Sequence, residues 1–153
     1  MASGSSQPQM NSSVQNSDQA DRLENYGIYK LATELFSAFW DDADTLMEDL
    51  RGRELVRQQT RSLDSVCANI EEGYGRGFGK ELPQHLKIAR GEARESRGRF
   101  QRLARLLPPK TITERIATLD HIIGGLTKTI VTIERRRQPE RLTSPATRHS
   151  SHL

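Results

Sequence analysis

The sequence has little of several features that define common protein classes. It contains one cysteine, Cys67, which excludes an internal disulfide bond and a cysteine metal cluster. Cys67 falls on an apolar helical stripe, so we expect a small core side chain and not a reactive thiol. No run of about eighteen apolar residues occurs, so no segment is expected to cross a membrane. The N-terminus has neither a basic region nor an apolar stretch, which argues against secretion and favours the cytoplasm.

Residues that carry catalytic chemistry are also sparse. Aromatic residues make up 5% of the chain, and the period-two alternation of a β-strand is absent. His85 and His121 have no nucleophile and acid partner that spacing can assign. Glu81 and His85 are four residues apart, whereas a di-iron bundle needs Glu and His three apart on two helices. We therefore predict no enzyme activity, no cofactor and no metal site, and no small-molecule substrate is evident.

Both ends of the chain are polar. Residues 1–21 consist mainly of Ser, Gln, Asn and Gly, and residues 138–153 have a similar composition with two histidines, His149 and His152. Such segments cannot bury enough apolar surface to offset the entropy of ordering them. We therefore expect two disordered tails around a single domain of residues 22–137.

Between the tails, apolar residues recur with steps of three and four, the period of an amphipathic α-helix. The four patterns span residues 22–41, 49–74, 80–107 and 111–137. Short links between long neighbouring helices favour antiparallel packing. The sequence therefore predicts an all-α fold, an antiparallel up-down-up-down four-helix bundle.

Three of the four patterns have unbroken steps of four and three. In the second helix these steps pass through Val56, Thr60, Leu63, Cys67, Ile70 and Tyr74. In the third helix the stripe consists of Leu82, Leu86, Ala89, Ala93, Ser96, Phe100, Leu103 and Leu107. In the fourth helix it consists of Ile112, Ile116, Leu119, Ile123, Leu126, Ile130 and Ile133. We expect Leu63, Phe100 and Ile123 at the middle of the core.

Turn residues predict where the helices end. Asp41, Asp42 and Asp44 are expected to form a polar link after the first helix. Four glycines in residues 73–79 cannot sustain a helix, so the second helix ends there. These glycines follow a helix and lack the Gly-Lys-Ser/Thr ending of a phosphate-binding P-loop, so we do not predict a nucleotide site.

Prolines set the limits of the last two helices. Pro83 fits the first turn of the third helix, where its missing N–H costs least. Pro108 and Pro109 are expected to end the third helix. Thr111 and Glu114 have the spacing of a capping box, which predicts that the fourth helix begins at Thr111.

The net charge of +3 is distributed unevenly. Residues 21–50 contain eight acidic and two basic residues, a net charge of −6. Residues 80–107 contain eight basic and three acidic residues, a net charge of +5, and residues 110–137 contain six and three, a net charge of +3. The acidic and basic helices can attract one another within or between subunits, or the basic ones can attract a phosphate backbone.

A candidate phosphate-binding surface follows from one helical face. Lys87, Arg90, Arg94, Arg97 and Arg105, which we call the basic stripe, lie on one side of the third helix. The alternative is a solvated face or a set of partners for the acids of the first helix. Few aromatic residues are nearby, so any binding is expected to read the backbone and shape of RNA or DNA and not its bases. Arg135–Arg137 end the fourth helix, where cations favour the helix dipole.

A polar triplet lies near the end of the second helix. Asn69, Glu72 and Arg76 step by three and four and therefore share one face. They can bond across to the third helix, or they can satisfy neighbouring groups of their own helix. Both interpretations are open at this point.

Two sequence blocks carry a family resemblance. They have the order N-I-x-E-G-x-G-R, a short turn, and L-x-I-A-R-G-x-x-x-E, at residues 69–76 and 86–95. This order resembles the four-helix bundle family of 23S ribosomal RNA intervening-sequence proteins. The polar residues of this motif are Asn69, Glu72, Arg76 and Glu95.

The resemblance implies a bacterial bundle that assembles into a cyclic homopentamer, with a role connected to nucleic acid. The family is also similar to accessory proteins of diversity-generating retroelements, which bind a reverse transcriptase and nucleic acid. The chain departs from the family pattern at Glu71 and Glu92, where members usually carry Ala and Ser. Aromatic residues common after the glycine turn are replaced by Leu82, Pro83 and His85.

Residues and resemblance together predict a non-enzymatic, oligomeric accessory protein that associates with RNA or DNA. The alternative is a protein-binding scaffold whose basic stripe faces acids of a neighbouring subunit and has no nucleic-acid role.

Overall fold

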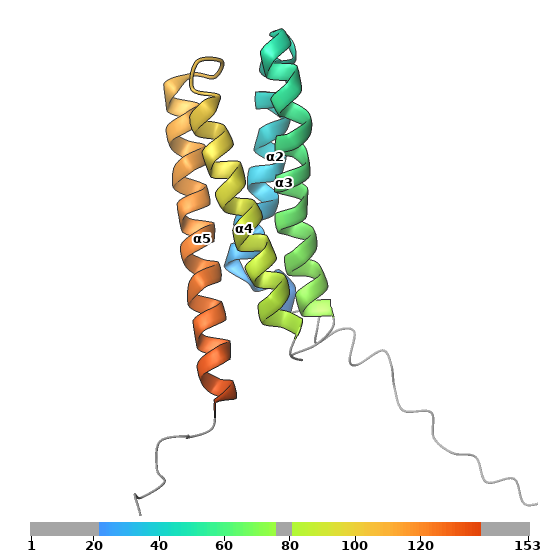
Figure 1. The fold of residues 1–153 in the computed structure, drawn as a ribbon, viewed down its shortest axis with the longest axis vertical. Helices are drawn as coiled ribbons and strands as arrows, with labels where there is room; N and C mark the ends of the chain where they lie inside the picture. The colour runs from blue at the N-terminus through green and yellow to red at the C-terminus, as the bar shows by residue number, and fades with distance from the viewer. Residues whose placement is uncertain (1–21, 76–80, 139–153) are drawn as a thin grey trace, which may run out of the picture.

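The computed structural model describes residues 22–75 and 81–138, which form four long α-helices (Figure 1). These are α2 (Gly27–Met47), α3 (Leu50–Gly75), α4 (Glu81–Arg102) and α5 (Pro109–Arg137). A short helical segment, residues 22–24, precedes α2. The tails predicted at residues 1–21 and 138–153 lie outside the described residues, except for Gln138, and so does the glycine turn after Gly75.

The helices run alternately up and down, as Figure 1 shows, and each packs against its neighbours in sequence. α5 returns to α2 and closes the bundle through the smallest of the four helix contacts. The described residues contain no β-strand. The predicted all-α four-helix bundle is therefore confirmed.

The first helix is longer than its apolar pattern suggested. Asp41, Asp42 and Asp44 do not form a link, because α2 continues through them to Met47. Phe39, Asp42 and Leu46 are all buried, at steps of three and four. The helix continues to Met47 because burial of Leu46 in the core stabilises one further turn after Asp42. The sequence pattern missed this turn because a charged residue, Asp42, occupies a buried position in it.

Two residues, Glu48 and Asp49, connect α2 to α3. A carboxylate oxygen of Asp49 accepts the backbone N–H of Arg51 at 2.8 Å, so Asp49 caps the start of α3. Hydrogen bonds from the Arg51 side chain and backbone hold the pKa of Asp49 far below its usual range. Gly52 is required here, since a Cβ atom at this position would lie 2.2 Å from the carbonyl oxygen of Leu46.

The link between α4 and α5 also differs from the prediction. α4 ends at Arg102, and the residues up to Leu106 continue in turns. α5 begins at Pro109, whose fixed φ suits the first position of a helix. The predicted capping box at Thr111 is therefore wrong, and no side chain caps α5 at its N-cap, Pro108. Pro83 does lie in the first turn of α4, as predicted.

The core follows the predicted stripe of the third helix closely. All eight of its residues are buried, including Phe100, which has no exposed surface. The ring of Phe100 meets the ring of Phe39 edge-on, with centroids 6.0 Å apart. Leu63, the predicted core residue of α3, is 2% exposed. Burial of these side chains supplies the main favourable term in folding.

In α5 the predicted stripe lies in the core, with Ile112, Leu119, Leu126 and Ile130 buried, but its middle residue differs from the prediction. Ile122 is fully buried, whereas Ile123 is only partly buried. The buried residues near it are Leu119, Ile122, Leu126 and Ile130, with steps of three, four and four. A straight helix of 3.6 residues per turn drifts from an alternating three-four step in this way, which moves Ile123 to the edge of the core.

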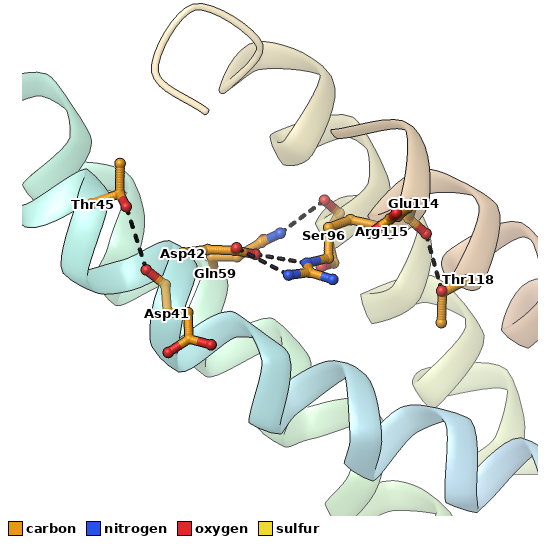
Figure 2. A network of polar contacts seen from close by, with 8 residues as sticks. All are labelled: Asp41, Asp42, Thr45, Gln59, Ser96, Glu114, Arg115 and Thr118. Atoms are coloured by element: carbon orange, nitrogen blue, oxygen red, sulfur yellow. Dashed lines mark hydrogen bonds and ion pairs between the residues drawn. The ribbon is translucent and has the colours of Figure 1, made fainter. Parts of the chain in front are cut away.

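A buried ion pair joins α2 to α5. Nε and Nη2 of Arg115 donate to the two carboxylate oxygens of Asp42 at 2.7 and 3.1 Å, as Figure 2 shows. The side chains of Asp42 and Arg115 are 6% and 18% exposed. The ionised Asp42 raises the pKa of the Arg115 guanidinium. This pair fixes how the last helix meets the first.

Two tyrosines of the N-terminal region add polar contacts. The hydroxyl of Tyr29 donates to a carboxylate oxygen of Glu71 at 2.7 Å and so joins α2 to α3. Glu71, one of the departures from the family pattern, therefore has a structural role in this chain. The hydroxyl of Tyr26 lies 2.8 Å from the hydroxyl of Thr129 on α5.

Among the described helices, α5 is long and apolar enough by composition to cross a membrane. Its most apolar 18-residue window has a mean hydropathy of 1.2, and 22% of that window is buried in the bundle. Leu119, Leu126 and Ile130 are among the core residues that α5 contributes. The expectation that no segment crosses a membrane stays a prediction.

Candidate nucleic-acid interface

The basic stripe lies along α4 and the turn that follows it. Its members, Lys87, Arg90, Arg94, Arg97 and Arg105, recur at helical spacing. The opposite side of α4 carries the buried residues, so the stripe occupies the outer side and its border with α5. The contacts of its members divide the stripe into two groups.

Two members of the stripe form ion pairs with α5. Nζ of Lys87 lies 2.5 Å from a carboxylate oxygen of Glu134. Nε of Arg97 donates to Oδ1 of Asp120 at 2.6 Å, and its Nη2 lies 3.4 Å from Oδ2. Asp120 raises the pKa of Arg97. The acids that meet this part of the stripe therefore belong to α5 of the same chain and not to the acidic first helix.

Arg90 also reaches α5. Its Nη1 donates to Oγ1 of Thr127 at 3.3 Å, and that hydroxyl donates to the carbonyl oxygen of Ile123. Arg90 is partly buried, like Lys87 and Arg97. These three cations hold α4 against α5, so they are poorly placed to neutralise phosphates.

The other two members of the stripe face solvent. Arg94 and Arg105 are exposed, and neither forms a hydrogen bond or ion pair within the described residues. The same holds for three further arginines of α3 and α4. We call the set of five the outer arginines: Arg57, Arg61, Arg94, Arg102 and Arg105.

The register of α3 against α4 brings most outer arginines to one end of the bundle. Gln59 on α3 bonds Ser96 on α4, and Ser62 bonds Arg99. The first half of α3 therefore lies beside the second half of α4. Arg57 and Arg61 come from that half of α3, Arg102 ends α4, and Arg105 lies in the turn that follows. A basic surface on two neighbouring helices is the footprint that a phosphate backbone needs.

Asn69 and Glu72, two of the polar motif residues, lie toward the other end of this helix pair. Nδ2 of Asn69 donates to the carbonyl oxygen and the hydroxyl of Ser65, at 2.8 and 3.1 Å. Oδ1 of Asn69 lies 3.3 Å from Nδ1 of His85 on α4. Asn69 therefore bonds a neighbour in its own helix and also lies within hydrogen-bond distance of the third helix, so both interpretations describe part of its contacts. Glu72 is exposed, and Arg76 lies outside the described residues.

A buried polar network was not anticipated from the sequence. Arg99 is 7% exposed, and its Nη1 donates to Oε1 of Gln59 at 2.8 Å and to Oγ of Ser62 at 3.0 Å. Nε2 of Gln59 donates to the carbonyl oxygen of Ser96 at 3.1 Å, as Figure 2 shows. One signal was available, because Gln59 and Ser62 precede Leu63 and Val66 by four residues and so share their buried side.

Two members of this network, Ser62 and Arg99, line a cleft between α3 and α4 with a volume of about 480 Å³, the α3–α4 cleft. Glu95, the last polar residue of the family motif, lines this cleft together with Glu92, the second departure from the family pattern. The cleft is lined by Gln58, Arg61, Ser62, Asp64, Ser65, Ala68, Glu92, Glu95 and Arg99.

The residues with metal-binding or nucleophilic chemistry lie apart. Within residues 22–75 and 81–138, no group of His, Cys, Asp and Glu side chains has the arrangement of a metal site. Cys67 is buried, and burial together with Glu71 and Asp64 raises the pKa of its thiol to about 11. His121 is exposed, and His149 and His152 lie outside the described residues.

Comparison with known proteins agrees with the motif in this helix pair. No curated protein and no solved structure matches the chain. One protein family does match, over residues 24–128, which include α2, α3, α4 and most of α5. The outer arginines of α3 and α4 and the motif contact of Asn69 all fall within this matched region. The chain belongs to the family of 23S rRNA-intervening sequence proteins.

Proposed function

We propose that this chain is a non-enzymatic protein of the bacterial cytoplasm that binds the phosphate backbone of RNA or DNA. The observation that carries the proposal is the set of outer arginines on α3 and α4, which are exposed and unpaired within the described residues. Membership of a family named for a ribosomal RNA intervening sequence supports a role connected with nucleic acid.

The backbone, and not the bases, is the proposed target. The outer arginines are single cations on rigid helices, and such groups contact phosphates without reading sequence. Of the basic stripe, Arg94 and Arg105 are the proposed phosphate contacts. Lys87, Arg90 and Arg97 are proposed to support them by holding α4 against α5.

We further propose that the protein self-associates, as a cyclic homopentamer by family resemblance. An apolar groove of about 210 Å³ between α2 and α3 supports self-association. Its wall includes Phe36, Trp40 and Met47, and the last two are 65% and 47% exposed. Leu50, at the adjacent start of α3, is 79% exposed. Exposed apolar surface of this kind favours an interface between proteins. A ring would repeat the outer arginines and add avidity.

The same groove favours a second candidate function. A scaffold that binds only proteins would use Trp40 and Met47 for its contacts and need no nucleic acid. In that case the outer arginines would face acidic residues of a neighbouring subunit. The two functions differ in whether the purified protein binds nucleic acid at all.

Fluorescence anisotropy with labelled RNA and DNA duplexes separates the two functions. Backbone binding predicts similar affinity for two unrelated sequences and an affinity that falls steeply with salt. A protein that binds neither duplex at low salt would exclude the nucleic-acid function and leave the scaffold.

Light scattering tests self-association independently. Wild-type protein is expected to have a mass several times that of one chain, and Trp40→Glu with Met47→Glu is expected to reduce it. Exposed Ser37→Glu with Glu48→Gln, outside the groove wall, serves as the control that keeps the assembly. A monomeric mass for the wild-type protein at tens of micromolar would exclude the assembly.

A further inference from the structure

We propose that the α3–α4 cleft binds a small molecule that carries a carboxylate and a cationic group separated by the length of a long side chain. A basic amino acid is the simplest compound of this class. Of the residues that line this cleft, Arg61 is also one of the outer arginines, whereas Arg99, Glu92 and Glu95 have no part in the proposed nucleic-acid binding.

The anionic end of the proposed ligand is set by Arg99. This side chain is 7% exposed and lines the cleft, yet it forms no ion pair within the described residues. Nη1 makes both of its hydrogen bonds, and Nε is buried without a partner. A buried guanidinium that lacks an anion is costly in free energy. A carboxylate that binds the part of the guanidinium facing the cleft would therefore be strongly favoured.

Neighbouring groups add hydrogen-bond donors and a cation to the cleft wall. Oγ of Ser62 accepts a hydrogen bond from Arg99, and Oγ of Ser65 accepts one from Asn69. Each hydroxyl therefore keeps its own hydrogen for donation to a ligand. Arg61 is exposed and lines the same cleft, so its guanidinium supplies a second cation in the cleft wall.

Two carboxylates in the cleft wall would bind the cationic group of the proposed ligand. Glu95 and Glu92 line the cleft, and neither forms an ion pair within residues 22–75 and 81–138. They precede Arg99 by four and seven residues on α4. At 1.5 Å of rise per residue, their Cα atoms therefore lie roughly 6 and 10 Å from the Cα atom of Arg99 along the helix axis. Burial lowers the pKa of Arg99, as does the charge of Arg102, while Glu95 and Glu92 oppose that shift from a distance.

The mixture of acidic and basic residues in the cleft wall excludes several classes of ligand. Glu92, Glu95 and Asp64 in the wall repel a free phosphate, which carries no cation to offset them. A divalent cation is unsuited for the opposite reason, because Arg61 and Arg99 face the same space. A molecule with a carboxylate and a cation too close together cannot reach both ends. The side chain of lysine or arginine provides a separation of the required order.

Isothermal titration calorimetry of the full chain tests this with four probes. ε-Aminocaproate carries both charged groups at the required separation, and it is expected to bind. Caproate lacks the amine, hexylamine lacks the carboxylate, and glycine holds its charges too close together. Each of these is expected to bind about tenfold more weakly or worse, because one charge-assisted hydrogen bond cannot form. Equal binding of caproate or hexylamine, or no binding of ε-aminocaproate at tens of millimolar, overturns the proposal.

Variants at the exposed part of the wall keep the test independent of folding. Replacement of Arg99 would break the buried network, so Arg61→Gln and Glu95→Gln are the better choices. Each is expected to weaken ε-aminocaproate binding about tenfold. Arg57→Gln and Glu54→Gln, exposed on α3 outside the cleft wall, are the matched controls and should bind as wild type does. Equal affinity in all four variants contradicts the assignment.

Two further probes distinguish a free amino acid from the C-terminus of a peptide as the ligand. Free lysine and a short peptide that ends in lysine share the same carboxylate and ammonium groups. Tighter binding of free lysine indicates a metabolite, and tighter binding of the peptide indicates a chain end. Amidation of the peptide's C-terminus removes the carboxylate and is expected to abolish its binding. Retained binding of the amidated peptide would contradict the role of Arg99.

Discussion

Asp42 of α2 and Arg115 of α5 form a two-point ion pair inside the smallest helix contact of the bundle. Asp42 is 5% exposed, so removal of its carboxylate would leave a partly buried cation without an anion. Asp42→Ala is expected to lower the free energy of unfolding by about 3 kcal/mol in urea denaturation. Asp41→Ala, at the exposed neighbouring position, is expected to change it by less than about 0.5 kcal/mol.

A second variant separates the charge from the space it fills. Asp42→Leu combined with Arg115→Met replaces both charged groups with apolar ones and is expected to regain most of the stability, since no unpaired charge remains. If Asp42→Ala alone costs less than about 1 kcal/mol, the pair does not hold α5 on α2.

Two adjacent isoleucines test the position of α5 in the core. Ile122 is fully buried and Ile123 is partly buried. Ile122→Ala is expected to cost about 2–5 kcal/mol, because the truncated side chain leaves a cavity. Ile123→Ala is expected to cost at least about 1 kcal/mol less, because solvent already reaches this side chain. The opposite order in chemical denaturation would restore the stripe predicted from the sequence.

Two glycines are expected to respond in opposite directions to alanine. A Cβ atom at Gly52 would lie 2.2 Å from the carbonyl oxygen of Leu46, and backbone cannot yield as a side chain can. Gly52→Ala is therefore expected to destabilise by about 1–3 kcal/mol. Gly91 has open space around its Cβ position, so Gly91→Ala is expected to stabilise α4 by up to about 1 kcal/mol. Thermal melts of the two variants give the comparison, and a stabilised Gly52→Ala would contradict the close approach of α2 and α3.

Stability is expected to fall at alkaline pH. Burial raises the pKa of Tyr29 and of Tyr74 to about 12, with Glu71 adding to the shift at Tyr29. The ordinary value of 10.0 applies in the unfolded chain. The folded state therefore holds these protons more tightly. Their contribution to stability is fully present below pH 10.0, and it is lost as the pH rises through about 12.

Urea denaturation across this range measures the effect. Cys67 acts in the same direction at lower pH, since its pKa is raised from 9.0 to about 11. Tyr74→Phe removes one titrating group and is expected to flatten the loss of stability above pH 10.0. Constant stability of the wild-type protein through this range would contradict the burial of these side chains.

The sequence predicted the buried positions of a helix well where every residue of its stripe was apolar or had a small side chain. The third helix kept one such stripe from Leu82 to Leu107, and every member of it is buried. The end of α2 could not be predicted in the same way, because Asp42 occupies a core position. Its partner Arg115 is 73 residues away in the chain, and no local pattern links the two.

The candidate interface was predicted as a helix face but not as a set of contacts. Helical spacing alone places the basic stripe on one side of α4. Its division depends on Glu134, Asp120 and Thr127, which meet the stripe only once α5 packs beside α4. Arg99 was missed for a related reason, since its hydrogen bonds are to Gln59 and Ser62 on α3.

The outer arginines of α4 carry the central claim, and the salt dependence of nucleic-acid binding tests it most directly. Fluorescence anisotropy of an RNA duplex is to be recorded over a range of salt for wild-type protein and for Arg94→Glu with Arg105→Glu. Lys30→Glu with Lys110→Glu makes the same change in net charge at exposed positions on α2 and α5, and it is the matched control. The claim predicts tight binding by the wild-type protein and a steep fall of log association constant with log salt concentration. In the arginine variant this slope is expected to be smaller in magnitude by about 0.9 for each phosphate that is no longer neutralised. It also predicts an unchanged mass of the assembly in light scattering. Equal binding by the arginine variant and the control, or loss of the assembly in the arginine variant, would contradict it.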